Sequence, residues 1–317
     1  MMKGGRPSLA FRRLCTATTL VTYLQIVWGG IVRVTASGRG CDSPHGGVDQ
    51  WPLCDGSLIP PFNQAGLIEF THRWLAAAAS TLIIAVAVMV FLRYRQAPRL
   101  MAGAIVVVVL IILQIILGQI TISTEESGYV VLVHLGNALL LLAGLVFVTV
   151  TAHTEGTQQK VRWANPPARS RLAAIAAVFT YLVVLTGSNV VAQSAGGSCD
   201  GWPFCAGHGG IGFTLAQTGP AAINLFHRFA AGILLLLLGA TVPIVRKFHR
   251  DDVALFRTGM IINVLLLLQI IAGAIVVEGN LPTWARGVHL ALASGLLGFV
   301  VLFALLARRP TAGVVAA

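Results

Sequence analysis

The segment Met101–Ile122 reads MAGAIVVVVLIILQIILGQITI, and none of its side chains is charged. A helix that crosses the ~30 Å hydrocarbon core of a bilayer needs about 20 apolar residues, so this segment predicts a membrane span. Seven other segments share its length and apolar character. The eight predicted spans are Arg13–Val34, Phe70–Leu92, Met101–Ile122, Tyr129–Thr151, Leu172–Gln193, Ala222–Val245, Phe256–Val277 and Trp284–Leu306.

The composition of all 317 residues agrees with this prediction. Hydrophobic residues make up 56% and charged residues only 10%, whereas a soluble domain has roughly 25% charged residues. This excludes a soluble enzyme, a disordered protein and a secreted disulfide scaffold. The sequence predicts an all-α polytopic membrane protein. Its net charge of +11 follows the membrane topology and does not indicate a nucleic-acid partner.

The distribution of charge predicts the orientation. Most of the 22 basic residues lie at the termini and in every second connection, including Arg12, Arg95, Arg171 and Lys247. The alternate connections contain mostly acidic residues. Cytoplasmic loops carry the excess of Lys and Arg, so both termini are predicted in the cytoplasm and the cysteine-bearing loops outside. We expect a multi-pass protein of the cytoplasmic membrane.

An internal repeat divides the chain into halves, predicted as residues 1–158 and 159–317. Phe70-Thr71-His72-Arg73 recurs as Leu225-Phe226-His227-Arg228, 155 residues later. The same offset relates Gln114-Ile115-Ile116-Leu117-Gly118 to Gln269-Ile270-Ile271-Ala272-Gly273, and Val133-His134-Leu135 to Val288-His289-Leu290. Two four-helix bundles in the same orientation suggest pseudo-two-fold symmetry about the membrane normal.

Each half contains two histidines within its spans, His72 and His134 in the first and His227 and His289 in the second. All four are expected ~5–9 Å inside the outer end of a helix, from a rise of 1.5 Å per residue. Ionisable residues in spans are costly and usually functional. Two imidazoles in a four-helix bundle suit haem iron, whereas zinc usually has three or four protein ligands. A histidine that only hydrogen-bonds a neighbouring helix is the alternative.

An arginine follows the first histidine of each half, Arg73 after His72 and Arg228 after His227. Arginine is suited to carboxylates, and haem carries two propionates, so these arginines are candidate propionate contacts. They are also placed to extend toward the aqueous interface, and the two interpretations are compatible.

Glu69 distinguishes the halves, because the matching residue is Asn224. Glu69 precedes His72 by three residues and shares its helix face. A carboxylate beside one haem only predicts chemistry in the first half, where Glu69 acts as a base or stabilises positive charge on a substrate carbon. The alternative is a first-turn glutamate favoured by the helix dipole.

Two cysteines lie in an outer loop of each half, Cys41 with Cys54 and Cys199 with Cys205. The outer side is oxidising, so we expect one disulfide in each loop. Each disulfide either stabilises its loop or, more so for Cys41–Cys54, passes electrons.

Together these residues resemble haem A synthase. The resemblance covers nearly the whole chain and rests on the eight spans, the four histidines with Glu69, Arg73, Asn224 and Arg228, the Trp-Pro-x-Cys loops, and Gly29–Gly38 ahead of Cys41. It implies oxidation of the C8 methyl group of haem O to a formyl group by successive hydroxylations, giving haem A for cytochrome c oxidase.

The resemblance also implies the role of each site. His72 and His134 would bind the substrate haem O, His227 and His289 a haem b cofactor, and Glu69 would be the catalytic carboxylate. Haem O synthase and cytochrome c oxidase assembly factors are the implied partners beside the lipid bilayer, and a homo-oligomer is compatible with the sequence.

Three other functions compete. The first is a two-haem cytochrome b that only moves electrons, although such proteins usually place their haems at two depths. The second is a haem transporter or chaperone, which leaves Glu69 unexplained. The third is a thiol-oxidising membrane enzyme, which leaves the histidines unexplained.

Overall fold

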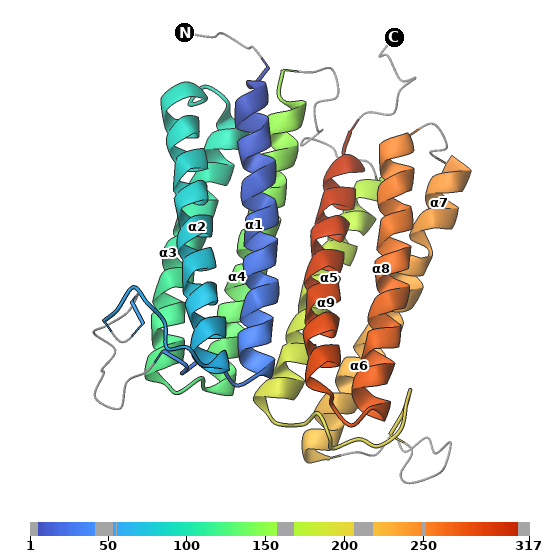
Figure 1. Cartoon of the computed structure of the whole chain (residues 1–317). Helices are drawn as coiled ribbons and strands as arrows, with labels where there is room; N and C mark the ends of the chain where they lie inside the picture. The colour runs from blue at the N-terminus through green and yellow to red at the C-terminus, as the bar shows by residue number, and fades with distance from the viewer. Residues whose placement is uncertain are drawn as a thin grey trace.

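A computed structural model describes residues 6–41, 53–54, 56–156, 168–205, 218–248 and 252–309. It confirms an all-α polytopic membrane protein, with eight helical segments long and apolar enough to cross a bilayer. Figure 1 shows the helices side by side as one elongated bundle. The helices are α1 (Leu9–Val34), α2 (Gln64–Arg93), α3 (Pro98–Ser123), α4 (Gly128–Thr154), α5 (Ala168–Ala192), α6 (Gly219–Gly239), α7 (Thr241–Phe248), α8 (Val253–Glu278) and α9 (Thr283–Leu306).

Several helices begin before the predicted apolar spans because polar residues cap them. The side chains of Ser8, Asn63 and Asp252 accept hydrogen bonds from the backbone N–H groups of the first turns of α1, α2 and α8. These bonds satisfy N–H groups that have no partner within the helix. Helix α3 begins at Pro98, since proline is tolerated in the first turn. These helices therefore begin before the apolar segments that were predicted to cross the bilayer.

The sixth predicted span, Ala222–Val245, is not one continuous helix. It forms α6 and α7, with Ala240 between them. Pro243 explains the interruption, because proline has no backbone N–H for the carbonyl group of Gly239 and its ring clashes with the preceding turn. The predicted span is confirmed as a helical segment long and apolar enough to cross a bilayer, over Gly219–Val245, and the helix is interrupted at Ala240 within it.

The helices pack in two groups. Helix α1 packs against α2 and α4, and α3 packs against α4 and α2, while α5 packs against α6 and α9, and α8 packs against α9. The start of α1 and the end of α9 lie at one end of the bundle, and the loop that follows α1 lies at the other (Figure 1). The predicted boundary between residues 158 and 159 lies outside the described residues.

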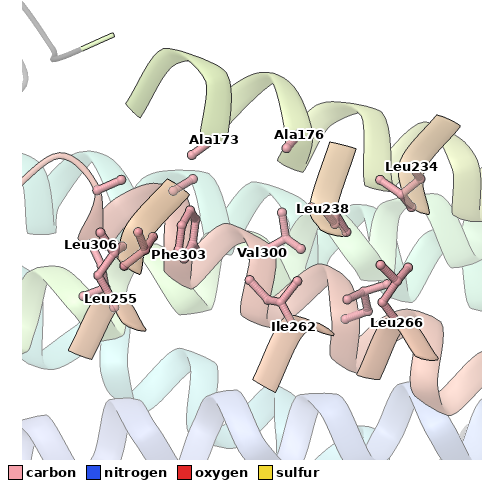
Figure 2. Packing of buried hydrophobic residues seen from close by; sticks show 14 of the residues in the cluster. Ala173, Ala176, Leu234, Leu238, Leu255, Ile262, Leu266, Val300, Phe303 and Leu306 are labelled. Carbon is pink, nitrogen blue, oxygen red and sulfur yellow. The ribbon is translucent and has the colours of Figure 1, made fainter. Parts of the chain in front are cut away.

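Each group has its own apolar core. In the first, α1–α4 bury a cluster that includes Phe11, Ile83 and Val107. In the second, Leu238, Ile262 and Val300 are almost completely buried. Figure 2 shows Leu238, Ile262 and Val300 directed toward one another from α6, α8 and α9. These cores fix the helices that carry the histidines.

The groups meet along α1, α4, α5 and α9. Tyr23 of α1 donates its hydroxyl to the backbone carbonyl of Ala291 in α9 at 3.1 Å, and Tyr181 of α5 donates to that of Gly136 in α4 at 3.4 Å. Gly136 and Ala291 thus contact tyrosines of the opposite group.

The core of the second group can be tested by truncating one side chain. Ile262→Ala should lower the unfolding free energy by about 2 kcal/mol or more, because the side chain is fully buried and its removal leaves a cavity. Ile261→Ala is the control, because Ile261 is 40% exposed on the same helix. Thermal unfolding in detergent measures both, and equal loss of Tm would contradict this packing.

Candidate functional site

The four histidines lie on four helices, His72 on α2, His134 on α4, His227 on α6 and His289 on α9. Within each half the two histidines lie on helices of one group, His72 and His134 on α2 and α4, and His227 and His289 on α6 and α9. Each histidine keeps part of its surface accessible, whereas the apolar cores are closed. The structure thus places one pair of histidines in each group of helices.

A glycine faces every one of these imidazole rings. A methyl group at Gly29 or Gly273 would lie 3.0 Å from Cε1 of His72 or His289. At Gly187 it would lie 2.8 Å from Cε1 of His227, and at Gly118 3.4 Å from that of His134. The rings of His72, His227 and His289 therefore lie so close to the backbone of a neighbouring helix that a larger residue would displace them, whereas His134 lies at an ordinary contact distance from Gly118.

Each ring also has a polar partner on a neighbouring helix. Three partners are glutamine side-chain amides: Gln25 for His72, Gln114 for His134 and Gln269 for His289. His227 differs, because its Nδ1 lies 2.9 Å from the hydroxyl of Thr186. Polar groups within a membrane bundle need such partners, since no water is present to replace them.

Three buried polar atoms at these sites have no hydrogen-bond partner within the described residues: Nδ1 of His289 and the Oε1 atoms of Gln25 and Gln269. No group of three or more His, Cys, Asp or Glu suited to a metal ion occurs in the described part of the chain. Two imidazoles per half, facing glycines and beside unpaired amide oxygens, fit a haem better than a zinc ion.

Glu69 is the only acidic side chain buried within the described residues, at 3% exposure. Its Oε2 accepts a hydrogen bond of 2.8 Å from the backbone N–H of Cys41, and Oε1 accepts one of 3.0 Å from Nε of Arg73. Helix α2 begins at Gln64, so Glu69 is not in the first turn. The alternative of a dipole-favoured first-turn glutamate is therefore wrong.

Asn224 takes the corresponding place in α6. Its Nδ2 donates to the carbonyl groups of Ala195 and Gly196, and its Oδ1 accepts from Nε of Arg228 at 2.9 Å. The amide thus secures the second outer loop as the carboxylate secures the first. The two halves therefore differ at this position, which carries an ionisable carboxyl group in the first half and an uncharged amide in the second.

Arg73 and Arg228 both bind the loop that bears the disulfide of their half. Arg73 donates to the carbonyl oxygen of Leu53, and Arg228 to those of Cys199 and Gly201. A guanidinium has five N–H groups, and Arg228 donates three hydrogen bonds, to Asn224, Cys199 and Gly201. The propionate contacts predicted for both arginines therefore stay a prediction.

Both expected disulfides are present in the structure. Cys41 pairs with Cys54 and Cys199 with Cys205, with Cα atoms 4.6 and 4.9 Å apart. The Trp and Pro of the first Trp-Pro-x-Cys motif, Trp51 and Pro52, lie outside the described residues. Cys41 also donates its backbone N–H to Glu69, so one cysteine of the first disulfide directly binds the buried carboxylate.

Sequence reasoning missed the polar partners of the histidines. Gln114 and Gln269 lay within a recognised repeat, four residues before Gly118 and Gly273, and this spacing was a signal for one helix face. Thr186 and Asn137 had no such signal. Arg286 was also missed; it donates from α9 to the carbonyl of Val34 at the end of α1, across the two halves.

Comparison with known proteins identifies the family. Residues 62–301 match the family model COX15-CtaA, described as cytochrome oxidase assembly protein. The chain belongs to this family. The matched range contains Glu69 and all four histidines.

Curated relatives are similar over almost their whole length. The haem A synthase of Symbiobacterium thermophilum is 30% identical over 91% of this chain and 92% of its own. That of Bacillus pumilus is 26% identical over 95% of this chain and 96% of its own. The similarity therefore extends through both halves of the COX15-CtaA fold.

The contact between Gly187 and His227 gives a direct test of the histidine geometry. We expect Gly187→Ala to lower the haem bound per chain about 10-fold at limiting haem, because a misplaced ligand environment typically costs 10–100-fold in metal affinity. Gly232→Ala on α6 is the matched control, since no atom lies within 4 Å of its new methyl group. Pyridine haemochrome spectra measure the haem content of both variants. An unchanged haem content in Gly187→Ala would contradict the close contact between Gly187 and His227.

Proposed function

We propose that this chain is a haem A synthase that oxidises the C8 methyl group of haem O to a formyl group. Its family membership supports a role in haem A biosynthesis and cytochrome oxidase assembly. The observation that carries the finer proposal is the buried Glu69, one helical turn from His72, with no acidic counterpart in the second half. On this proposal the oxidation of haem O takes place in the first half of the chain.

The substrate haem O binds in the first half through His72 and His134. Glycines 29 and 118 allow these rings to lie against α1 and α3. Two hydroxylations with oxygen from water remove four electrons and four protons from the methyl group, loss of one water from the resulting diol leaves the aldehyde, and an electron acceptor outside the chain takes the four electrons. The hydrophobic tail of haem O suits a site between helices that face lipid, since many apolar residues of α2 and α3 are exposed.

Glu69 is the group placed to assist this oxidation. The Cys41 N–H and the Arg73 guanidinium bind its two oxygens and hold the carboxylate in one position. Fixed charge in a site without water stabilises a developing positive charge more strongly than it would in water. Glu69 thus stabilises positive charge at the substrate carbon or accepts the proton that it releases.

A haem b in the second half, bound by His227 and His289, would supply one-electron transfer. Thr186 fixes His227 for this role. Its hydroxyl donates to the carbonyl of Val183 at 2.7 Å, so its oxygen accepts from Nδ1–H of His227, and Nε2 keeps its lone pair for iron. His289 offers a buried Nδ1 with no partner within the described residues.

The membrane placement follows from the charge distribution. With both termini in the cytoplasm of a multi-pass protein of the cell membrane, the histidines and disulfides lie near the outer surface. Haem O and the lipid bilayer are the implied partners, and haem O synthase is the class of enzyme that must supply this substrate.

Glu69→Gln tests the role of the carboxylate better than Glu69→Ala. The amide keeps the size of the side chain and an oxygen for Arg73, and it replaces the oxygen that accepts from the Cys41 N–H with an N–H₂ group. We expect haem O and haem b to remain bound while the formyl product falls at least 100-fold, which is the usual scale for a general acid–base group. Pigments extracted from protein co-expressed with a haem O source, separated by chromatography and weighed by mass spectrometry, give both quantities.

Asn224→Asp is the matched control, because it places an acid at the equivalent site of the second half. Production of haem A should continue in this variant. Undiminished haem A from Glu69→Gln would contradict the role of Glu69. Haem b alone, at about two copies per chain in the unaltered protein, would support a two-haem cytochrome instead.

His227→Ala separates the two haem sites. The variant should lose haem b, since one of the two histidines that would hold it is absent, and should retain haem O on His72 and His134. Haemochrome spectra of the purified variant measure the ratio. Full haem b content would place the cofactor elsewhere, and Phe226→Ala is the control because this neighbouring side chain is 63% exposed.

A further inference from the structure

The orientation of the Gln114 amide is determined by its neighbours. Asn137 donates from Nδ2 to the backbone carbonyl of Leu110 at 2.9 Å. A carbonyl only accepts, so this contact fixes which end of the Asn137 amide faces α3. The same Nδ2 donates to Oε1 of Gln114 at 2.7 Å. The Gln114 oxygen is therefore occupied, and its Nε2–H₂ group faces His134 at 3.1 Å from the ring Nε2 and 3.4 Å from Nδ1.

The second half lacks this arrangement. Gln269 lies against His289 with Nε2 atoms 3.2 Å apart, but its Oε1 has no partner within the described residues. The residue 155 positions after Asn137 is Leu292, which has no hydrogen-bonding side chain. The Gln269 amide is therefore free to rotate and present its oxygen to His289.

This difference affects how well each histidine binds iron. An imidazole that coordinates iron through one nitrogen carries a proton on the other, and that N–H usually donates to a carboxylate, carbonyl or water. His134 meets an amide N–H₂ group, a second donor, at the place where an acceptor is needed. Gln114 turns its oxygen to His134 only by breaking its bond with Asn137, which would leave the buried Asn137 amide short of an acceptor.

The other two histidines show the same contrast. Gln25 donates from Nε2 to the backbone carbonyl of His72 at 3.2 Å, so its N–H₂ group also faces the His72 ring. In the second half, the Thr186 hydroxyl is an acceptor for His227, as derived above. Each histidine of the first half thus has a hydrogen-bond donor beside its ring. In the second half, His227 has an acceptor beside its ring and His289 has an amide that can rotate.

We propose that Asn137, acting through Gln114, keeps His134 a weak axial ligand, so that haem in the first half exchanges while haem in the second half is retained. Asn137 and Gln114 are positioning residues, because neither is a haem ligand. The inference rests on the proposed function only in naming the exchanging haem as substrate and product. A haem that must leave as product needs a ligand that releases it.

Replacing Asn137 with the residue of the second half tests this proposal. Asn137→Leu frees the Gln114 amide to rotate and accept from His134. We expect the first-half haem, which carries the hydrophobic tail, to leave about 10-fold more slowly, at the lower end of the 10–100-fold range for outer-shell changes. Excess apomyoglobin is the haem acceptor, its absorbance gives the rate, and chromatography of the remaining pigment identifies which haem has left.

The reciprocal variant Leu292→Asn is the matched test in the second half. An amide at this position supplies Gln269 with a donor for Oε1 and fixes its N–H₂ group toward His289. Haem b should then leave about 10-fold faster while the first-half haem is unaffected. Because each variant alters one haem and not the other, general loss of folding, which would release both, is distinguished from the proposed effect.

Unchanged release of both haems in Asn137→Leu, or faster release of the first-half haem alone, would overturn the proposal. Should Asn137→Leu fail to fold, Leu292→Asn decides alone, and unaltered haem b release in that variant would overturn the proposal. The absence of tailed haem from every extract would contradict the proposed function instead, while the rate of haem b release from Leu292→Asn would still test the inference.

Discussion

Four imidazole rings lie within an apolar bundle, where the protein itself must satisfy every polar atom that water does not reach. The rest of the site follows from this requirement. Each ring lies on a glycine of a neighbouring helix and beside a glutamine or threonine of that helix, at Gln25 with Gly29, Gln114 with Gly118, Thr186 with Gly187 and Gln269 with Gly273. One helix of each adjacent pair supplies the ligand, and the other supplies its hydrogen bond and the space for it.

The same requirement connects the membrane interior to the outer loops. Glu69 could not remain buried as an anion without donors, and it receives them from Cys41 and Arg73. Arg73 in turn binds the carbonyl of Leu53 beside Cys54, so the carboxylate, arginine and disulfide loop form one connected unit. The second half builds the same unit with an uncharged amide at Asn224. The scaffold therefore does not require the acid at position 69, and its presence there points to chemistry.

Sequence patterns predicted the eight spans, the histidine pairs and the cysteine pairs, because each depends on periodicity, charge or repetition along the chain. The interruption between α6 and α7 was missed because Pro243 lies in a segment whose apolar composition is otherwise continuous. The bond between Glu69 and Cys41 was missed because 28 residues separate them and only the fold of the loop brings them together. The direction of the Gln114 amide was also missed, since it is set by a backbone carbonyl at Leu110 and not by residue identity.

The repeat gives both halves the same pair of histidines, so under the proposed function the difference between a substrate site and a cofactor site must come from what surrounds these histidines. Two substitutions account for much of it. Glu69, where the second half has an asparagine, adds a reactive group. Asn137, where the second half has a leucine, fixes the direction in which Gln114 presents its amide. Under the proposed function, the first provides for chemistry and the second for release, and an enzyme whose product is itself a haem needs both in the same half. On the same proposal, a half with neither would keep its haem and be suited to carry electrons.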